Sequence, residues 1–365
     1  MAKVLKVEGG VEEGLRKLLF DLLDSGQVKG VLALRRLDEK GAAAYSLAAD
    51  PATVKDILPF HPLMPAQGGR VLSRLTGTEG FAEPVAALVR PCELRAFVEL
   101  VKRTQGSLEN LLVISCTCPG VYPLSASLDG GLGPKLETYW AAAAENEVPD
   151  GLRPACTACT EFVPYGADMT VSLIGGRDTE VVLNTSKAVE AVGKLSGEIA
   201  ESNGDVKAIE AMRAERGANR KKLFEEDSAV HGGLDGLVKL FGRCIGCRGC
   251  REVCPICYCD LCEFVSRRSD LTPEGLQADL SGRGALRLPP GTLTYHLGRL
   301  AHMAVSCVAC GQCTDVCPAD IPVSTVFSRA GASVQGMFEY LPGRDVDEPL
   351  PLTTFRTEEL AEVED

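Results

Sequence analysis

Two cysteine runs of identical spacing constrain this chain of 365 residues more than any other feature of its sequence. The first run consists of Cys244, Cys247, Cys250 and Cys254, the second of Cys307, Cys310, Cys313 and Cys317, and a proline follows each. Gaps of two residues let three thiolates wrap one face of an iron–sulfur cubane, and Gly246, Gly249 and Gly311 permit the tight turns that this requires. The pattern therefore predicts two [4Fe–4S] clusters.

The same pattern predicts which thiolates share a cluster. In two-cluster ferredoxins the fourth cysteine of each run, ahead of the proline, binds the cluster held by the other run. Cluster A would be held by Cys244, Cys247, Cys250 and Cys317, and cluster B by Cys307, Cys310, Cys313 and Cys254. Paired Cys-x-x-Cys motifs also suit tetrahedral zinc. Three close thiolates with a distant fourth, found twice, fit a cubane better.

Composition and charge favour redox chemistry in the cytoplasm. The net charge of −12 argues against a nucleic-acid partner, because phosphate binding needs a basic face. No run approaches the roughly 18 apolar residues that a membrane span needs, and the first residues do not resemble a signal peptide. In the cytoplasm the sixteen cysteines are expected as reduced thiols or metal ligands rather than as disulfides.

The first 200 residues have the pattern of alternating helices and strands. Apolar spacing predicts helices at 11–23, 91–101 and 186–200, and strands at 28–34, 85–89, 111–115, 169–174 and 180–183. Prolines and the pair Gly68-Gly69 predict an irregular segment over 57–75. Strand, helix and strand in this order indicate a parallel α/β core.

An abrupt rise in cysteine density near residue 235 predicts a domain boundary. We predict an α/β (α+β) domain over 1–200, a charged helical linker over 201–235, a largely helical ferredoxin-like domain over 236–340 and an acidic arm over 341–365. The insert between the two runs, 255–306, is expected to carry a docking surface and a helix at 295–305. His296 and His302 on that helix are interpreted as ordinary core or surface histidines rather than as ligands.

A second set of cysteines lies in the first 200 residues. It consists of Cys92, Cys118 and the pair Cys156 and Cys159. Cys92 and Cys118 come shortly after predicted strands, at the carboxyl edge where α/β folds place their sites. Four thiolates meeting there would suit a metal, although a lone Cys-x-x-Cys is a weak signal and buried thiols are common in protein cores.

Several of these segments resemble the β-subunit family of deazaflavin-reducing (coenzyme F420) hydrogenases and formate dehydrogenases. The similar segments are 86–100, 111–122, the cysteine pair with its flanks at 153–176, and the opening helix and strand over 9–32. The resemblance implies a third [4Fe–4S] cluster on Cys92, Cys118, Cys156 and Cys159. It also implies an FAD beside that cluster, exchanging a hydride with the deazaflavin.

The chain departs from this family in two respects. Its ferredoxin-like part follows the α/β part, whereas many members carry it first, and the flavin-binding opening loop is reduced to Glu8-Gly9-Gly10. Gly9 and Gly10 are therefore the candidate flavin-binding residues. The ferredoxin-like half resembles modules that connect hydrogenases, formate dehydrogenases and heterodisulfide reductases.

Two functional interpretations follow from this. The chain is an electron-transfer, beta-type subunit of such a multisubunit oxidoreductase with its own FAD, or a flavin-free conduit that joins two other redox subunits. Four cysteines remain: Cys116, Cys257, Cys259 and Cys262. The last three could hold part of a further cluster if a fourth ligand, such as Cys116, came from elsewhere; they could also shield cluster B or bind nothing.

Overall fold

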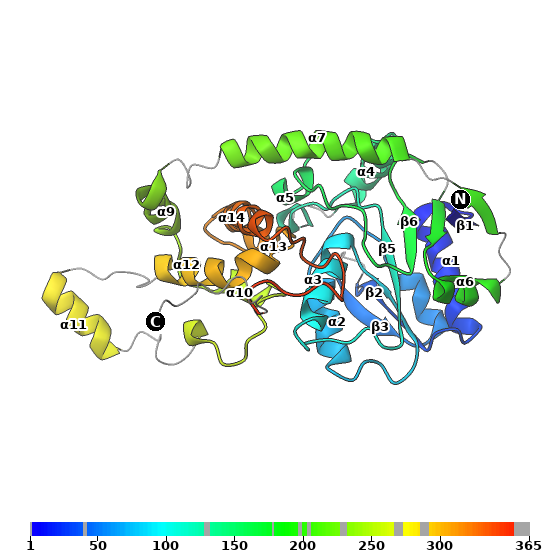
Figure 1. Cartoon of the computed structure of the whole chain (residues 1–365), viewed down its shortest axis with the longest axis horizontal. Helices are drawn as coiled ribbons and strands as arrows, with labels where there is room; N and C mark the ends of the chain where they lie inside the picture. Colours follow the sequence, from blue (N-terminus) through cyan, green and yellow to red (C-terminus); the bar gives the residue numbers. More distant parts are fainter. Residues whose placement is uncertain are drawn as a thin grey trace, which may run out of the picture.

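The computed structural model describes residues 2–38, 42–127, 132–176, 179–195, 199–202, 206–226, 232–265, 273–284 and 292–353. It has a sheet-containing part and a helical part, drawn at opposite ends in Figure 1. Helix α7 (Val206–Glu225) runs along both parts. No helix among the described residues is long and apolar enough to span a membrane.

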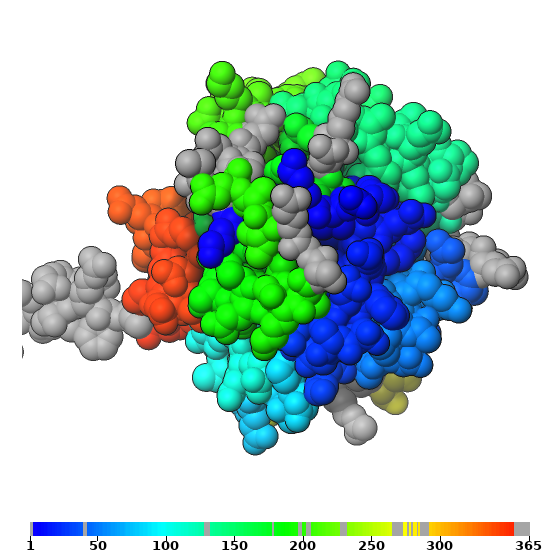
Figure 2. Space-filling view, turned by 90° about the vertical axis from the view of Figure 1, so that its right-hand side faces the viewer, coloured from blue at the N-terminus to red at the C-terminus, as the bar shows by residue number. Residues whose placement is uncertain are grey.

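One sheet of eight strands, in the order β3-β2-β4-β5-β6-β7-β1-β8, organises the first part. The strands are β1 Ala2–Val7, β2 Gly30–Arg36, β3 Ala43–Ala48, β4 Val85–Leu88, β5 Leu111–Cys116, β6 Met169–Ser172, β7 Thr179–Leu183 and β8 Ile199–Ser202. Strands β2, β4, β5 and β6 are parallel, and the other pairings are antiparallel. The parallel core is thus confined to the centre of a mixed sheet. Figure 2 looks onto the end where the blue N-terminal residues lie beside the green segments.

Helices cover both faces of this sheet. On one face Ala86, Leu88, Leu112 and Ile114 pack in a core with α1 (Gly10–Asp24), and on the other Val85, Ala87, Leu111 and Val113 pack in a core with α2 (Gly68–Thr76) and α3 (Pro91–Val101). Strands β4 and β5 are buried along their whole length because alternate side chains enter two cores. Their carboxyl ends therefore reach a protected edge.

Helix α2 lies in the stretch that the sequence predicts as irregular. A Cβ atom on Gly69 would collide with the carbonyl oxygen of Glu93 and the backbone nitrogen of Phe97. The two glycines are therefore required for the close approach of α2 to α3 and do not break the helix. Other helix ends agree better with the predictions. Helices α1 and α3 match their predicted ranges, whereas α6 (Ser186–Gly193) ends earlier than predicted.

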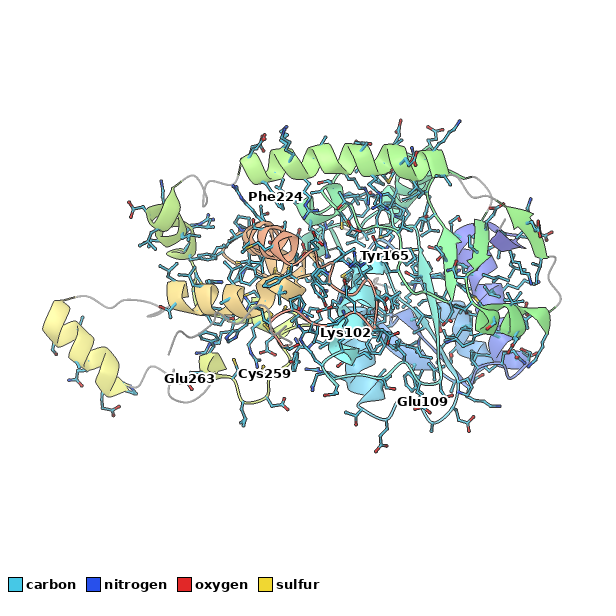
Figure 3. All side chains as sticks on the ribbon, in the orientation of Figure 1. Lys102, Glu109, Tyr165, Phe224, Cys259 and Glu263 are labelled. Carbon is cyan, nitrogen blue, oxygen red and sulfur yellow. The ribbon has the colours of Figure 1, made fainter. Side chains whose placement is uncertain are left out.

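The remaining helices lie mostly in the helical part. They are α4 Gly133–Ala144, α5 Pro154–Thr157, α9 Gly233–Phe241, α10 Gly249–Glu252, α11 Pro273–Arg283, α12 Thr292–Met303, α13 Gln312–Asp315 and α14 Val323–Met337. A separate core in the helical part contains Phe241, Ile256, Ile321 and Phe327, with six cysteines packed against it. Helix α7 falls within the predicted charged linker, yet Met212 and Arg216 on it are buried. Phe224 near its end (Figure 3) accepts a hydrogen bond from Arg329 of α14 through its carbonyl oxygen.

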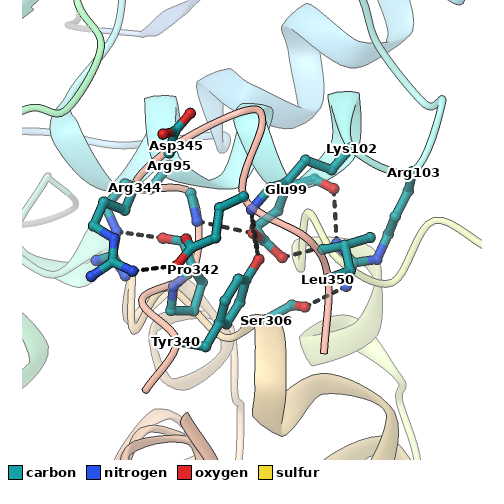
Figure 4. Close-up of polar contacts among 12 residues, drawn as sticks. Arg95, Glu99, Lys102, Arg103, Ser306, Tyr340, Pro342, Arg344, Asp345 and Leu350 are labelled. Atoms are coloured by element: carbon teal, nitrogen blue, oxygen red, sulfur yellow. Dashed lines mark hydrogen bonds and ion pairs between the residues drawn. The ribbon is translucent and has the colours of Figure 1, made fainter. Parts of the chain in front are cut away.

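The chain after α14 returns to the first part of the molecule. Tyr340 and the Gly343 N–H donate hydrogen bonds to the Glu99 carboxylate of α3, and Arg95 Nε donates to the Pro342 carbonyl at 2.7 Å (Figure 4). The predicted acidic arm is thus described up to residue 353, where it packs on the α/β part. Residues 354–365 of that arm lie outside the described residues.

Candidate metal centres

Cys92, Cys118, Cys156 and Cys159 converge at the carboxyl edge of β4 and β5. Cys92 is in the first turn of α3, Cys118 follows β5, and the pair lies on and just after α5. Burial raises the pKa of the Cys92 thiol, and the neighbouring Cys118 and Cys156 raise it further. Burial and Cys118 also raise the pKa of Cys159. Each thiol is therefore close enough to feel the charge of another.

Two buried arginines face these thiols. Arg90 donates from Nη1 to the Cys118 sulfur at 3.2 Å and from Nη2 to the Phe60 carbonyl at 2.8 Å. Arg216 of α7 donates to the carbonyls of Cys118 and Pro119, at 3.1 and 2.6 Å. A hydrogen bond from Cys116 and the charges of both arginines lower the pKa of Cys118 despite its burial. This environment favours a thiolate, the form that binds metals.

Cys244, Cys247, Cys250 and Cys317 gather in the helical part. Burial raises the pKa of the Cys244 thiol, and the nearby thiols of Cys247 and Cys317 raise it further. The Gly246 N–H, 3.4 Å from the Cys244 sulfur, acts in the opposite direction. The Ile321 N–H donates to the Cys317 sulfur, also at 3.4 Å. Cys247 is exposed whereas Cys250 is buried, so this group lies close to the surface on one side.

Cys254, Cys307, Cys310 and Cys313 line one cavity. Cys254 and Cys257 lie beside the Met303 sulfur, at 4.0 and 3.5 Å. Among the residues that the structure describes, no three side chains of His, Cys, Asp or Glu form a site for a single metal ion. In a cubane each thiolate binds a different iron, so the ligands stand farther apart than around one ion.

This cavity and the N-terminal thiols meet across the interface of the two parts. Arg153, three residues before Cys156, donates to the Cys310 carbonyl at 3.0 Å, and its Nη2 lies 2.5 Å from Asp315 Oδ2 of α13. Gly311 packs so tightly here that a Cβ atom would lie 2.7 Å from Ala155. Cys310 is also one of the charges that raise the pKa of Cys92. The two groups of thiols are therefore neighbours.

The remaining cysteines do not form one group. Cys116 is buried in β5 and packs in the core on α1, whereas Cys257 packs against the core of the helical part. The structure thus does not bring Cys116 to the other three as a fourth ligand. Cys257, Cys259 and Cys262 line a cavity with Arg251 and His302, and Arg251 donates to the Cys259 carbonyl at 2.9 Å. Cys259, labelled in Figure 3, is exposed.

Gly9 and Gly10 are exposed at the start of α1. Their φ angles of +94° and +76° explain the choice of glycine, because other L-residues rarely adopt such angles.

The polar partners of the cysteines could not be predicted from the sequence. Arg90 adjoins the Pro91-Cys92 motif, but nothing in the charged stretch around Arg216 marks it as buried.

Comparison with known proteins finds a matching domain family and two similar proteins. Residues 241–321 match the model of the 4Fe-4S dicluster domain. The chain is 27% identical, over 94% of its length and 93% of the relative's, to the F420-dependent formate dehydrogenase subunit beta of Methanocaldococcus jannaschii. It is 28% identical to the F420-dependent formate dehydrogenase 1 subunit beta of Methanococcus maripaludis, covering 93% of this chain and 92% of that one. The chain is a homologue of these beta subunits.

The family resemblance and the C-terminal 4Fe-4S dicluster domain predicted from the cysteine motifs are thereby confirmed. One solved structure is also similar to this beta-subunit homologue. A chain of the F420-reducing [NiFe] hydrogenase complex from Methanosarcina barkeri matches with a TM-score of 0.45 and 14% identity, covering 64% of this chain and 93% of that one.

Proposed function

We propose that this chain is the electron-transfer, beta-type subunit of a multisubunit oxidoreductase of the formate dehydrogenase or hydrogenase type. The names of its homologues, which are subunits of F420-dependent formate dehydrogenases, support this class of complex. The observation that carries the proposal is the meeting of the N-terminal and C-terminal thiols around Arg153. Such neighbours form a continuous series of redox sites through one chain.

Three sets of thiols would hold three [4Fe–4S] clusters. Cluster A would be bound by Cys244, Cys247, Cys250 and Cys317, cluster B by Cys307, Cys310, Cys313 and Cys254, and the N-terminal cluster by Cys92, Cys118, Cys156 and Cys159. The residues fit this group, because every cysteine of the three sets except Cys247 is buried or half-buried, and Arg90 and the Ile321 N–H donate hydrogen bonds to two of the sulfurs. A [4Fe–4S] cluster, when bound, accepts and releases electrons one at a time.

The protein's own residues would set the properties of these sites. Arg90 and Arg216 place positive charge beside Cys118, which stabilises added negative charge. The apolar core of the helical part would exclude water from the thiols that pack against it, such as Cys307 and Cys313. Exclusion of water and hydrogen bonds to sulfur are the means by which a protein adjusts a cluster's reduction potential.

FAD stays a prediction of the family resemblance. Within this proposal it would convert hydride transfer into single-electron steps. The flavin-free conduit is the second candidate, and the exposed, shortened turn at Gly9 and Gly10 favours it. A further cluster on Cys257, Cys259 and Cys262 also stays a prediction.

Iron, sulfide and flavin content per chain tests the proposal, on protein purified without oxygen. About twelve irons are expected for three clusters. One FAD in addition would select the subunit with its own hydride chemistry, and no flavin would select the conduit. Zinc in place of iron, or no metal at all, would overturn the proposal.

A further inference from the structure

One face of α12 contacts the thiols of both cluster sets in the helical part. Tyr295, His296, Arg299 and Met303 are its buried residues, at the spacing of one helix face. The Tyr295 hydroxyl and His296 Nε2 lie 3.7 and 3.4 Å from the sulfurs of Cys250 and Cys244. Met303 lies beside Cys254. Arg299 is near the middle of this row.

Arg299 reaches both sets of thiols. Its side chain is 3% exposed, and it donates to the Cys250 sulfur at 3.2 Å and to the Cys250 carbonyl at 3.1 Å. It also lines the cavity of Cys254, Cys307, Cys310 and Cys313. The guanidinium is held over the rings of Tyr295 and Phe327, at 5.6 and 5.0 Å from their centres.

The environment of Arg299 is unusual for a buried cation. Burial acts to lower its pKa, but Cys257, Cys250 and Cys254 outweigh burial and raise the pKa, so its electrostatic partners are thiols. Its Nε is buried and has no hydrogen-bond partner among the described residues. An unpaired buried N–H is costly, and a sulfide of a bound cluster would offer the missing acceptor.

We propose that Arg299 is a positioning residue shared by the two C-terminal clusters, whose buried charge raises the reduction potentials of both. This inference rests on the proposed function, because it requires clusters A and B to be bound. Reduction adds one electron, and so one negative charge, to a cluster. A desolvated cation beside both sites stabilises that charge more than one in water would. The helix that carries it belongs to the insert between the two cysteine runs.

The test is a redox titration of the full iron-loaded chain, followed by electron paramagnetic resonance. At the potential where a C-terminal cluster is half reduced in the wild type, Arg299→Met should lower the ratio of reduced to oxidised cluster about tenfold for both clusters, which is about 59 mV for one electron. The N-terminal cluster should be unchanged. Arg299→Lys, which keeps the charge, should restore most of the ratio.

Arg243→Met is the matched control, because Arg243 adjoins Cys244 but is exposed. In this variant the ratio of reduced to oxidised cluster should change less than twofold, since water screens the charge of Arg243. Full iron content with an unchanged ratio in Arg299→Met would overturn the inference, and so would an equal fall in the control. Should Arg299→Met lose iron, Arg299→Gln takes its place with the same expectation. A wild-type chain without clusters would instead refute the proposed function.

Discussion

Individual residues decide whether a thiol in this chain can serve as a ligand. Cys118 and Cys116 are two positions apart and both lie within the core on α1, yet Arg90 donates a hydrogen bond to the Cys118 sulfur. Both are buried. Burial alone therefore does not separate a candidate ligand from a structural cysteine, whereas the donors around the sulfur do.

Replacing Cys159 tests the N-terminal set at this scale. Cys159→Ala should remove about four irons per chain and leave the C-terminal clusters bound. Cys116→Ser, a control on a buried cysteine outside the set, keeps a hydroxyl donor beside Cys118 and should retain all iron. Iron and sulfide analysis with electron paramagnetic resonance measures both. Equal iron in the two variants would show that Cys159 is an ordinary core thiol.

His61 gives the protein a pH-dependent stability. Burial, with the charges of Arg90 and Arg36, lowers its pKa from 6.5 to about 4. The unfolded chain then binds a proton at His61 before the folded chain does, so stability is full above pH 6.5 and falls as the pH drops toward 4.

Between pH 7.5 and 5.5 this difference costs about 1 kcal/mol. His61→Gln should remove that part of the pH dependence, whereas the control His302→Gln, on an exposed histidine, should retain it. Denaturant unfolding at the two pH values is the measurement. A slope that is the same in wild type and His61→Gln would contradict the assignment.

At the scale of elements, α3 connects the cysteine sites to the end of the chain. Its first turn carries Cys92, and its last turns bind segment 338–353 through Glu99 (Figure 4). Burial acts to raise the pKa of Glu99, but the hydrogen bond from Tyr340 and the charges of Arg103 and Lys102 outweigh it. Arg103 also donates to Ser306, the residue before Cys307. One helix thus fixes features on both parts of the molecule.

Removing one hydroxyl should loosen this connection. Tyr340→Phe deletes the bond to the Glu99 carboxylate, which should cost about 1.5 kcal/mol, the lower range for a bond to a charged group. Hydrogen exchange in 338–353 should accelerate while iron content stays unchanged. Asp347→Asn changes only an exposed side chain in the same segment and should have little effect. Unchanged exchange in Tyr340→Phe would show that other contacts hold the segment.

At the scale of the whole molecule, the interface between the two parts contains a buried ion pair. Arg153 and Asp315 are 1% and 4% exposed in their side chains, and Gln312 donates to the Met64 carbonyl nearby at 3.0 Å. Breaking a buried pair leaves an uncompensated charge, which is strongly destabilising. The approach of the N-terminal thiols to Cys310 therefore depends on this pair.

Asp315→Asn should destabilise the folded chain by about 3 kcal/mol. Asp320→Asn is a suitable control, because Asp320 is exposed and asparagine tolerates its φ of +50°. Denaturant unfolding of the iron-loaded protein provides the comparison. Equal stability of the two variants would mean that Arg153 is satisfied by the Cys310 carbonyl alone.

The C-terminal dicluster domain and the central strands could be predicted from sequence, because the first depends on the spacing of the cysteines and the second on the spacing of apolar residues. Thiolates two residues apart and alternate apolar side chains have the same meaning in any fold. Helix α2 was missed because Gly68 and Gly69 break helices in isolation, and only the closeness of α3 makes them necessary. Arg90, Arg216 and Arg299 could not be identified either, because a charged residue becomes a buried partner of sulfur only when distant segments enclose it. The approach of Cys310 to Cys92 likewise joins residues more than 200 positions apart, and tertiary packing alone decides it.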